Sequence, residues 1–368
     1  MTAPAAPRPD RLDKLAGALL GAAVGDALGL PREGLSRRRA ARMYGGAPLR
    51  HRFLLGRGML SDDAEHACMT AQALLAAPHD DRAFARSLAW RLRGWLAAMP
   101  AAVGWGTLRA ILKLWLGFPP ARSGVRSAGN GPAMRAPILG ACLSGAPDRL
   151  EAVVLASTRL THRDPRAEEG ALAIAIAAAH AARSGPDRVD PQAVLDEIRG
   201  HITVEPLRAS LDVVADHLRR GAPAAELAAA LGLEEGVSGY VLHTVPAALY
   251  CWLAHPGDFR RAVEDIILLG GDADSTGAIV GGLAGASSGA GAIPAEWLDG
   301  IVDWPRSVRW MRRLAARLAA RFGDSEAPAA GAPPEGPLPI FWPAILPRNL
   351  FFLAVALAHG FRRMLPPY

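Results

Sequence analysis

Residues 268–289 read LLGGDADSTGAIVGGLAGASSG, and this segment predicts a closely packed helix with two aspartates at its start. Asp272 and Asp274 stand behind a double glycine and ahead of a run of small residues. That run, residues 275–289, predicts a closely packed helix, since small side chains let another backbone approach. Carboxylates are favoured at a helix N-terminus, and Asp is a common capping residue. Capping accounts for one aspartate but not for two followed by Ser275, so this helix start is a candidate ligand site.

A second helix start has the same chemistry. The sequence SDDAEHACMTAQALL, residues 61–75, opens with Ser61, Asp62 and Asp63 and continues with apolar residues on one helical face. Ser61 as N-cap with acidic first-turn residues is a sound local explanation. Together, however, the two starts carry four carboxylates and two hydroxyls, and these hard oxygen ligands suit Mg²⁺ or Mn²⁺, as one ion or two. Without a cation, four carboxylates brought together would repel one another.

Three known motifs contain aspartates spaced as in the DADST segment, and the surrounding sequence argues against each of them. In an EF-hand loop that began at Asp272, the twelfth residue would be Leu283, where a Glu is needed. The D-x-D-x-T motif of haloacid-dehalogenase-type phosphatases matches Asp272, Asp274 and Thr276, but it implies a preceding strand and a downstream lysine. No lysine follows Lys113. A glycosyltransferase D-x-D would need a nucleotide-sugar fold with a sheet, which the sequence does not predict.

The chain as a whole has helical rather than strand periodicity. The run IILL at 266–269 is the best short apolar segment, and it is too isolated to build a sheet. We therefore predict an all-α fold of many moderate helices separated by Gly and Pro. The clearest helical ranges are 61–77, 82–98, 149–160, 166–183, 206–219 and 306–322.

Composition narrows the class of protein. The chain has 368 residues, 21% of them charged, which is globular and sufficient for one large domain or two. The net charge of +6 comes almost wholly from arginine, a bias typical of a high-GC genome, so we expect no sequence-specific nucleic-acid binding. Three scattered cysteines without a CxxC pair fit a reducing compartment. The N-terminus lacks the apolar core of a signal peptide, so we expect a cytoplasmic protein.

The sequence predicts four segments. Residues 1–10 read as a disordered lead, 11–322 as the helical body, 323–337 as a Pro/Ala/Gly linker and 338–368 as an apolar tail. Within the tail, NLFFLAVALAHG predicts a helix capped at Asn349 and stopped at Gly360.

The nine apolar residues of this tail helix are too few to span a bilayer, which needs roughly 20. We expect the helix to dock on the body or on a second copy. The alternative is a membrane-surface contact aided by Arg362 and Arg363.

Three further islands of sequence point to a site. GALLGAAVGDALGLPREG, residues 17–34, is a small-residue helix with Asp26 in a Gly-Asp step and Glu33 behind it. SAGNGPAMRAPILG, residues 127–140, is a turn whose backbone N–H groups could hold a phosphate or a ribose. THRDP places His162 in a turn. Taken singly, a loop Glu or a turn His is more often solvated or capping.

The order of these islands resembles the ADP-ribosylglycohydrolase family, which includes the dinitrogenase-reductase-activating glycohydrolases. The order is GxAxGDALGxPxEG, then SDD at a helix start, GNGxAMR, TH, and GGDxDS before an Ala/Gly helix. The resemblance covers roughly residues 11–292 and leaves the tail outside. It implies an all-α orthogonal multi-helix bundle with a dinuclear Mg²⁺ or Mn²⁺ centre. It also implies hydrolysis of the bond at ribose C1″ to release ADP-ribose from a modified protein or a small acceptor.

The resemblance assigns a role to each matching position. Among the implied metal ligands, Ser61 and Ser275 stand where the family usually has Thr, and a serine still provides the hydroxyl oxygen. Glu33 looks like the acidic residue near the scissile bond, and with Asp62 and Asp272 it forms the implied catalytic set. The implied ADP-ribose contacts are Ser127, Gly129, Asn130, Gly131, Met134 and His162, and the implied metal ligands are Ser61, Asp62, Asp63, Asp272, Asp274 and Ser275.

Two departures from the family pattern bear on the substrate. Ala128 stands where a Tyr commonly precedes the GNG loop. Ala102, in MPAAVGWGT at 99–107, stands where an acid is often found, which weakens the case for an arginine-linked substrate; Trp105 could offer a stacking face instead. These departures favour, as a rival hypothesis, an ADP-ribose-binding module with little catalysis. A scaffold or membrane-peripheral protein that uses the tail and helix 306–322 is a third.

Overall fold

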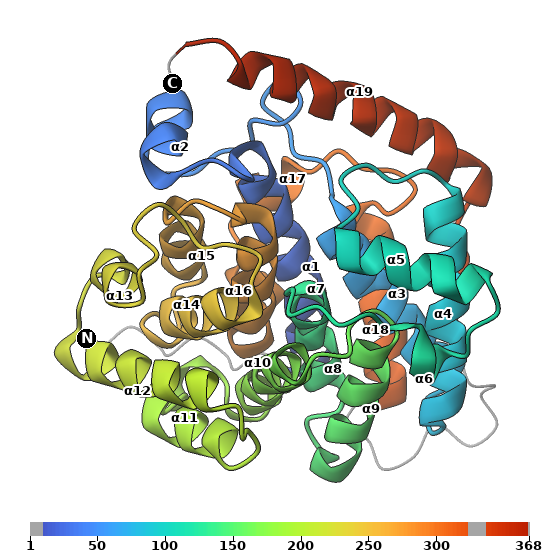
Figure 1. Ribbon diagram of the computed structural model, residues 1–368, viewed down its shortest axis with the longest axis horizontal. Coiled ribbons are helices and arrows are strands. Elements are labelled where there is room, and N and C mark those ends of the chain that lie inside the picture. The colour runs from blue at the N-terminus through green and yellow to red at the C-terminus, as the bar shows by residue number, and fades with distance from the viewer. Residues whose placement is uncertain (1–9, 323–335, 367–368) are drawn as a thin grey trace, which may run out of the picture.

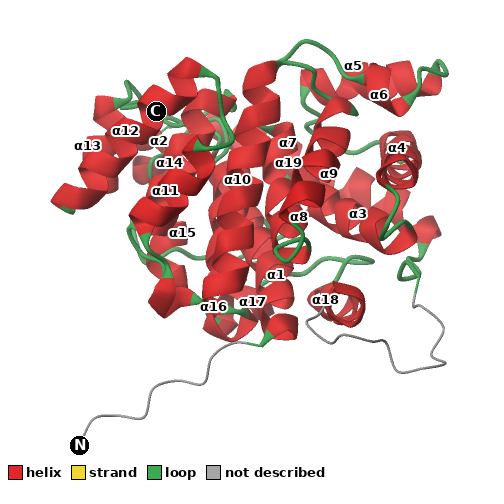
Figure 2. Cartoon of the chain, turned by 90° about the horizontal axis from the view of Figure 1, so that it is seen from below, coloured by secondary structure: helices red, strands yellow, loops and turns green. Residues whose placement is uncertain are grey.

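The computed structural model describes residues 10–322 and 336–366. Over these ranges the chain forms helices joined by loops, with isolated β-bridges and no strand, as Figure 2 shows. The predicted all-α fold is confirmed. The predicted lead and linker lie almost wholly outside the described residues. Residues 336–337, at the end of the linker, form an ordinary loop.

Within the described ranges the helices follow one another with loops and short 3₁₀ turns between them. In order they are α1 Arg11–Gly29, α2 Arg37–Tyr44, α3 Asp62–Ala76, α4 Asp81–Ala97, α5 Trp105–Trp115, α6 Pro120–Ser123, α7 Gly131–Met134, α8 Ala136–Cys142, α9 Pro147–Arg159, α10 Pro165–Ser184, α11 Pro191–Arg199, α12 Glu205–Arg220, α13 Ala224–Ala230, α14 Val241–Leu253, α15 Phe259–Leu268, α16 Ala273–Ser288, α17 Ala295–Asp299, α18 Val308–Phe322 and α19 Ile345–Arg363. Short 3₁₀ turns occur at Leu30–Arg32, Pro186–Arg188, Ala290–Ala292 and Trp342–Ala344.

The ranges with the strongest periodicity are helices in the structure. The six predicted ranges become α3, α4, α9, α10, α12 and α18, with ends shifted by at most two residues. The apolar run at 266–269 is the end of helix α15, not a strand. Helix α18 buries its apolar face, which includes Met311 and Leu314, against the body.

Helices α1 and α16 form an antiparallel pair in the middle of the molecule (Figure 1), and both are buried on nearly every side. Four glycines of α1 face α16 at four-residue intervals. A Cβ added at Gly17, Gly21, Gly25 or Gly29 would lie 1.9–2.2 Å from a backbone carbonyl oxygen of α16. The two backbones are therefore in direct contact, and only glycine fits along this line. Helix α1 and the turn after it, Arg11–Arg32, are long and apolar enough to cross a membrane, but 94% of the most apolar 18-residue stretch is buried, as in the core helix of a globular body.

This helix pair sets the position of the site. Since the two helices are antiparallel, the end of α1 and the start of α16 meet at one end of the pair. Asp26, in the last turn of α1, accepts hydrogen bonds from the backbone N–H groups of Ser61 and Ala64 at 2.9–3.1 Å. The start of α3 is thereby attached to the same end, and both acidic helix starts come together.

The tail prediction is wrong in its boundaries. Helix α19 begins at Ile345, four residues before the predicted cap, and Pro347 falls in its first turn, where a missing N–H is tolerated. Asn349 is not a cap but a buried residue inside the helix, and its Nδ2 donates to the carbonyl of Ala98 at 2.7 Å. Gly360 does not stop the helix, which continues to Arg363. With its 3₁₀ turn, the segment Trp342–Arg363 has 22 residues and is long and apolar enough to cross a membrane.

The close contact between α1 and α16 predicts the effect of a single methyl group. We expect Gly25→Ala to destabilise the protein by about 3 kcal/mol or more, because its Cβ would lie 1.9 Å from the Gly277 carbonyl oxygen. Gly94→Ala is the matched control in helix α4, where the nearest atom is 3.6 Å away and Ala should stabilise by roughly 0.5–1 kcal/mol. Urea unfolding of both variants measures the difference. Equal stabilities would contradict the packing described.

Candidate functional site

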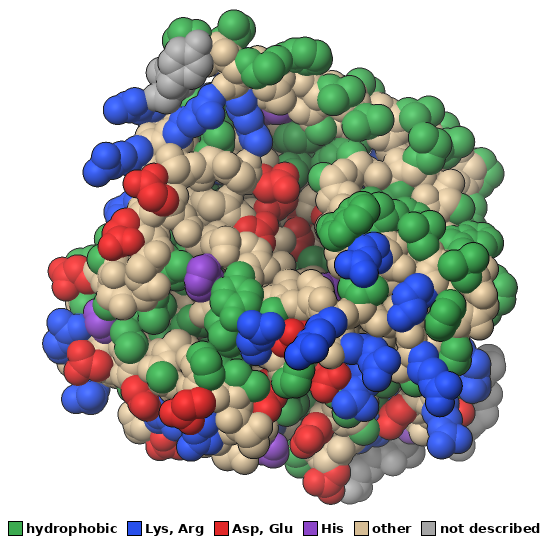
Figure 3. Space-filling model, viewed as in Figure 1, with side chains coloured by type: hydrophobic (Ala, Val, Ile, Leu, Met, Phe, Trp, Pro, Cys, Tyr) green, Lys and Arg blue, Asp and Glu red, His purple; other side chains and the backbone are tan. Residues whose placement is uncertain are grey.

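A pocket of about 570 Å³ opens where α1, α3 and α16 meet. Figure 3 shows the acidic side chains in a central hollow of the molecular surface. The volume lies within the range of small-molecule sites. Eleven residues predicted from the sequence line it: Glu33, Asp62, Ser127, Gly129, Asn130, Gly131, Met134, His162, Asp272, Asp274 and Ser275. The structure thus brings together residues from five separate segments.

The start of α16 is built by the double glycine. Gly270 and Gly271 both have positive φ, 78° and 82°, which only glycine adopts readily. Gly271 lies between two loops: its N–H donates to the Leu35 carbonyl at 2.8 Å, and a Cβ there would meet the Val237 oxygen at 2.2 Å. The glycines therefore let three loops come together at the pocket wall.

Asp272 occupies the N-cap position of α16 but makes no side-chain capping bond. Its Oδ2 instead accepts a hydrogen bond from Asn130 Nδ2 at 2.6 Å. Asp274 Oδ1 is buried and has no hydrogen-bond partner. Simple capping thus explains neither aspartate, and both carboxylates are directed to the pocket.

The two acidic helix starts are linked side chain to side chain. Ser61 caps α3, as predicted, by accepting from the Asp63 N–H. Asp63 Oδ2 accepts from the hydroxyls of both Ser61 and Ser275 at 3.2 Å. Ser61 and Asp63 do not line the pocket but lie buried beneath the carboxylates that do. One carboxylate therefore bridges α3 and α16 across 212 residues of sequence.

Burial and mutual repulsion raise the pKa values of this cluster. The pKa of Asp62, Asp63 and Asp274 lies well above its usual range, first because of burial and then because of neighbouring carboxylates. Burial raises the pKa of Asp26 to about 7 against the opposing effect of its hydrogen bonds. For Glu33, burial and the charge of Asp272 raise the pKa. A bound cation would reverse this preference for the protonated form.

The donor atoms fit a hard divalent cation. The buried Oδ1 atoms of Asp63 and Asp274 lack any hydrogen-bond partner, and an unpaired buried carboxylate oxygen needs a cation or a proton. The described residues do not, however, include three His, Cys, Asp or Glu side chains already gathered as metal ligands. The oxygens are present in one pocket, and metal ligation by them stays a prediction.

The GNG loop packs against His162. Added Cβ atoms at Gly129 and Gly131 would lie 3.1–3.2 Å from ring atoms of His162, so the loop lies directly on the imidazole. His162 Nδ1 is 2.9 Å from Thr161 Oγ1, and burial lowers the pKa of His162 to about 3. The ring is therefore neutral near pH 7, able to hydrogen-bond without carrying charge.

Sequence reasoning missed the residues that support these loops. Arg135 is fully buried and donates to the Gly131 carbonyl, to Ser157 and to Thr161 Oγ1, joining the GNG loop to the turn that carries His162. Its place in the GNGxAMR motif was the only signal. Asp26 was noticed as part of a Gly-Asp step, but its bond to the start of α3 depends on the fold.

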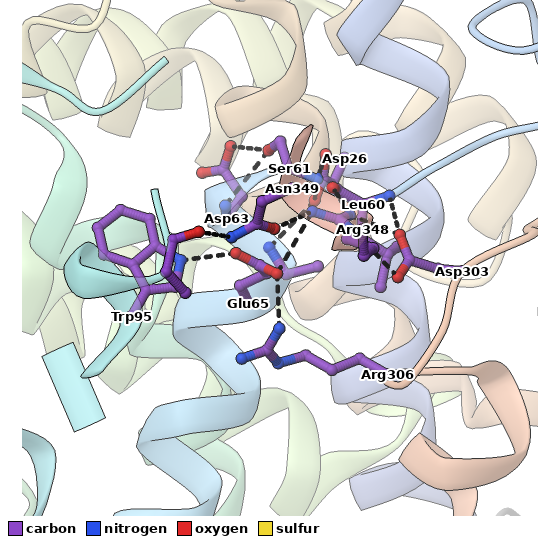
Figure 4. Close-up of polar contacts among 12 residues, drawn as sticks. Asp26, Leu60, Ser61, Asp63, Glu65, Trp95, Asp303, Arg306, Arg348 and Asn349 are labelled. Carbon is purple, nitrogen blue, oxygen red and sulfur yellow. Dashed lines mark hydrogen bonds and ion pairs between the residues drawn. The ribbon is translucent and has the colours of Figure 1, made fainter. Parts of the chain in front are cut away.

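A buried ionic network lies below the start of α3 (Figure 4). Glu65 accepts from Arg306 at 2.6 Å and from Trp95 Nε1 at 2.6 Å, and it is 3.5 Å from Arg348. Arg348, from α19, also pairs with Asp303 at 2.6 Å and donates to the carbonyl of Leu60. The tail thus contacts the residue that precedes Ser61.

The two departures from the family pattern have different positions. Ala102 lines the pocket in a left-handed conformation with φ 56°, beside Gly104 and Trp105. The Trp105 ring is 71% exposed and stands at the pocket rim. Ala128 does not line the pocket but packs against the hydrophobic core.

Comparisons with known proteins agree on one family. The model of the ADP-ribosylglycohydrolase family matches residues 7–328. An ADP-ribosyl-[dinitrogen reductase] glycohydrolase of Rhodospirillum rubrum is 28% identical over 319 residues, which cover 83% of this chain and 96% of that protein. ADP-ribosylarginine hydrolase Tri1 of Pseudomonas putida is 29% identical, covering 84% and 79%. A solved structure of an ADP-ribosylglycohydrolase-related protein complex is 31% identical with a TM-score of 0.64, covering 84% and 98%.

The ionic network below the site predicts a large effect of one side chain. We expect Arg348→Met to destabilise the protein by about 3–5 kcal/mol, because it leaves the buried Asp303 with the Leu60 N–H but without its charged partner. Arg309→Met on the exposed side of α18 is the control and should change stability by no more than about 0.5 kcal/mol. Chemical unfolding of both variants is the measurement. If the two lost the same stability, the network would have no structural role.

Proposed function

This chain belongs to the ADP-ribosylglycohydrolase family, and from that premise we propose that it hydrolyses the glycosidic bond at ribose C1″ of an ADP-ribosylated protein or of a small ADP-ribosyl acceptor. One observation carries the proposal. Five motif segments spread over more than 240 residues line a single pocket, and a hydroxyl–carboxylate contact joins its two acidic halves. A protein with only a structural role would have no need for so many buried carboxylates in one place.

We propose two Mg²⁺ or Mn²⁺ ions as the cofactor. The oxygen set of Ser61, Asp62, Asp63, Asp272, Asp274 and Ser275 would hold them, because hard cations prefer carboxylate and hydroxyl oxygens. Bound there, the ions would orient the ribose hydroxyls and lower the pKa of a water molecule. The unpartnered oxygens of Asp63 and Asp274 support this assignment.

The remaining residues have roles in binding and proton transfer. The backbone of the GNG loop, with His162 behind it, would hold the ADP-ribose through uncharged hydrogen bonds. Glu33 lines the same pocket with a raised pKa, so it is suited to hold or release a proton near the scissile bond. Asp62 and Asp272 would stabilise the positive charge that develops in an oxocarbenium-like transition state.

We propose an ADP-ribosylated protein side chain as the substrate class. Relatives are named for action on dinitrogen reductase and on ADP-ribosylarginine. In this chain Ala102 offers no carboxylate to a guanidinium leaving group, whereas Trp105 offers an exposed ring at the rim. This combination favours an acceptor other than arginine, or one recognised by stacking.

A second candidate, an ADP-ribose-binding module with little catalysis, rests on Ala102 alone. Release of ADP-ribose from arginine-linked, serine-linked and small-acceptor substrates, with and without Mg²⁺ or Mn²⁺, separates the two. We expect metal-dependent release of ADP-ribose from at least one substrate. In Asp272→Ala the rate of release should fall by more than the roughly 10–100-fold loss that is typical of removing a group that only orients a ligand. Asp187→Asn, an exposed control, should behave as wild type. Binding of ADP-ribose in calorimetry without release from any substrate would favour the binding module.

Metal binding should change stability with a defined pH dependence. The folded-state pKa of Asp26, about 7, exceeds its unfolded value of about 4, and Asp62, Asp63 and Asp274 are raised as well. The metal-free protein therefore loses stability as pH rises from about 4 through 7. Metal binds the ionised form, so the rise in Tm caused by Mg²⁺ or Mn²⁺ should be larger at pH 8 than at pH 5.5.

Thermal unfolding with and without metal measures this effect without an activity assay. Asp274→Asn should lose most of the metal-induced rise in Tm, and Asp187→Asn should retain it. A rise that is independent of pH, or equal in both variants, would count against metal ligation by this cluster.

Substitution of Ala102 should change which leaving group the protein prefers. We expect Ala102→Asp to raise kcat/KM for an arginine-linked substrate by about tenfold, since a carboxylate could pair with the guanidinium and Asp tolerates a left-handed backbone. Met99→Asp is the control: it has a similar φ of 54° but does not line the pocket. Steady-state kinetics should show the gain only at position 102 and only for the arginine-linked substrate. An equal gain for serine-linked substrates would contradict the pairing.

A further inference from the structure

Helix α19 presents an unusual surface to solvent. It packs on the body through Ile345, Asn349 and Phe352, and only 22% of the most apolar 18-residue stretch within Trp342–Arg363 is buried. The side chains on its outer face recur at helical spacing, and Figure 3 shows hydrophobic side chains along this edge of the molecule. The exposed large residues are Trp342, Leu346, Leu350, Phe351, Leu357, Phe361 and Met364.

A tight turn beside α19 exposes another large apolar side chain. Leu55 is 98% exposed and has φ 48°, in a turn closed by two backbone hydrogen bonds between Leu54 and Arg57. A left-handed backbone is unfavourable for a branched residue, by roughly 1–2 kcal/mol, and here it holds an apolar group in water. Between this turn and α19 lies an apolar groove of about 470 Å³, lined by Leu54, Leu55, Val355 and their neighbours.

The segments that form this surface are basic and contain no acidic residue, although the exposed Glu234 and Glu235 lie beside the start of α2, where the Glu235 carbonyl accepts from the Arg37 N–H. Residues 34–61 contain seven arginines, and residues 336–368 contain three, with no Asp or Glu in either segment. Helix α2, which carries Arg37, Arg38, Arg39 and Arg42, is attached to the end of α19: Arg39 donates to the Arg363 carbonyl. Figure 3 shows these basic groups beside the apolar edge. We call the outer face of α19, the Leu55 turn and the exposed arginines of α2 together the α19 surface.

We propose that the α19 surface binds a lipid bilayer that contains anionic lipids, with α19 lying in the plane of the interface. A large apolar face without carboxylates of its own, flanked by arginines, is complementary to acyl chains bordered by anionic headgroups. A second copy is a poorer match, because a symmetric contact would place this arginine-rich surface against itself. The proposal does not depend on the hydrolase activity.

The contacts of α19 indicate that it lies on a membrane and does not span one. Insertion across a bilayer would pull Arg348 away from Asp303 and Glu65 and Asn349 away from the Ala98 carbonyl. Binding in the plane leaves these buried contacts intact, since the exposed residues are on the opposite side of the helix. The acidic pocket opens on the face toward the viewer in Figure 3, whereas α19 lies along one edge, so a bound membrane would not close it.

Flotation of the full chain with vesicles tests the proposal. The vesicles are phosphatidylcholine alone, or phosphatidylcholine and phosphatidylglycerol in equal parts. We expect the protein to float with the mixed vesicles, and to do so less as salt is added. Leu350→Glu with Leu357→Glu should abolish flotation, while Leu12→Glu, on an exposed position at the start of α1, should not. Arg38→Gln with Arg362→Gln should weaken binding by about 25-fold, near fivefold for each arginine, while Arg188→Gln with Arg309→Gln should have little effect.

Thermal unfolding and ADP-ribose binding in calorimetry establish that each variant is folded. These controls also separate a failure of this proposal from a failure of the proposed hydrolase function. Absence of flotation with either vesicle would overturn the proposal, as would equal, salt-independent flotation with both. Self-association that is lost in the Leu350→Glu, Leu357→Glu variant, without lipid binding, would assign the surface to a second copy instead.

Discussion

The direct backbone contact between α1 and α16 is the constraint on which the rest of the structure depends. Four glycines at four-residue spacing remove every side chain from the line of contact, so the two helices approach as closely as their backbones allow. The end of α1 and the start of α16 then have fixed relative positions. Since Asp26 in α1 also holds the start of α3, a single helix pair determines where both acidic helix starts lie.

In the site, the burial of several carboxylates is unfavourable, and many specific contacts hold the surrounding backbone in place. Several carboxylates are buried together, and their raised pKa values are the expected response to burial and mutual repulsion. Around them the backbone is held by many specific contacts: Gly271 between two loops, Arg135 between the GNG loop and the His162 turn, and Glu65 beneath α3. Such support holds the carboxylates together in one pocket despite their mutual repulsion.

The tail connects this site with a different surface. Helix α19 lies beyond the residues matched by the family model, yet its Arg348 contacts Asp303, Glu65 and the Leu60 carbonyl directly below Ser61. At its other end Arg363 donates to the carbonyl of Pro31, two residues before Glu33. One helix therefore has an inner face that touches both sides of the site and an outer face that is apolar and unpaired.

The sequence by itself determined the helical class and most helix ranges, because these depend on local periodicity and capping. Through its resemblance to a family, the order of its motifs also indicated eleven of the residues that line the pocket. The start of α3 at Ser61 and the helix after Asp272 followed from local chemistry alone. Tertiary structure decided the rest. Asn349 looked like a cap, but a distant carbonyl, that of Ala98, makes it a buried partner inside a longer helix. Asp26 and Arg135 lay within recognised motifs, but their supporting roles come from partners far away in the sequence. Arg348 gave no local signal, and only the packed fold brings its partner Asp303 within hydrogen-bonding distance.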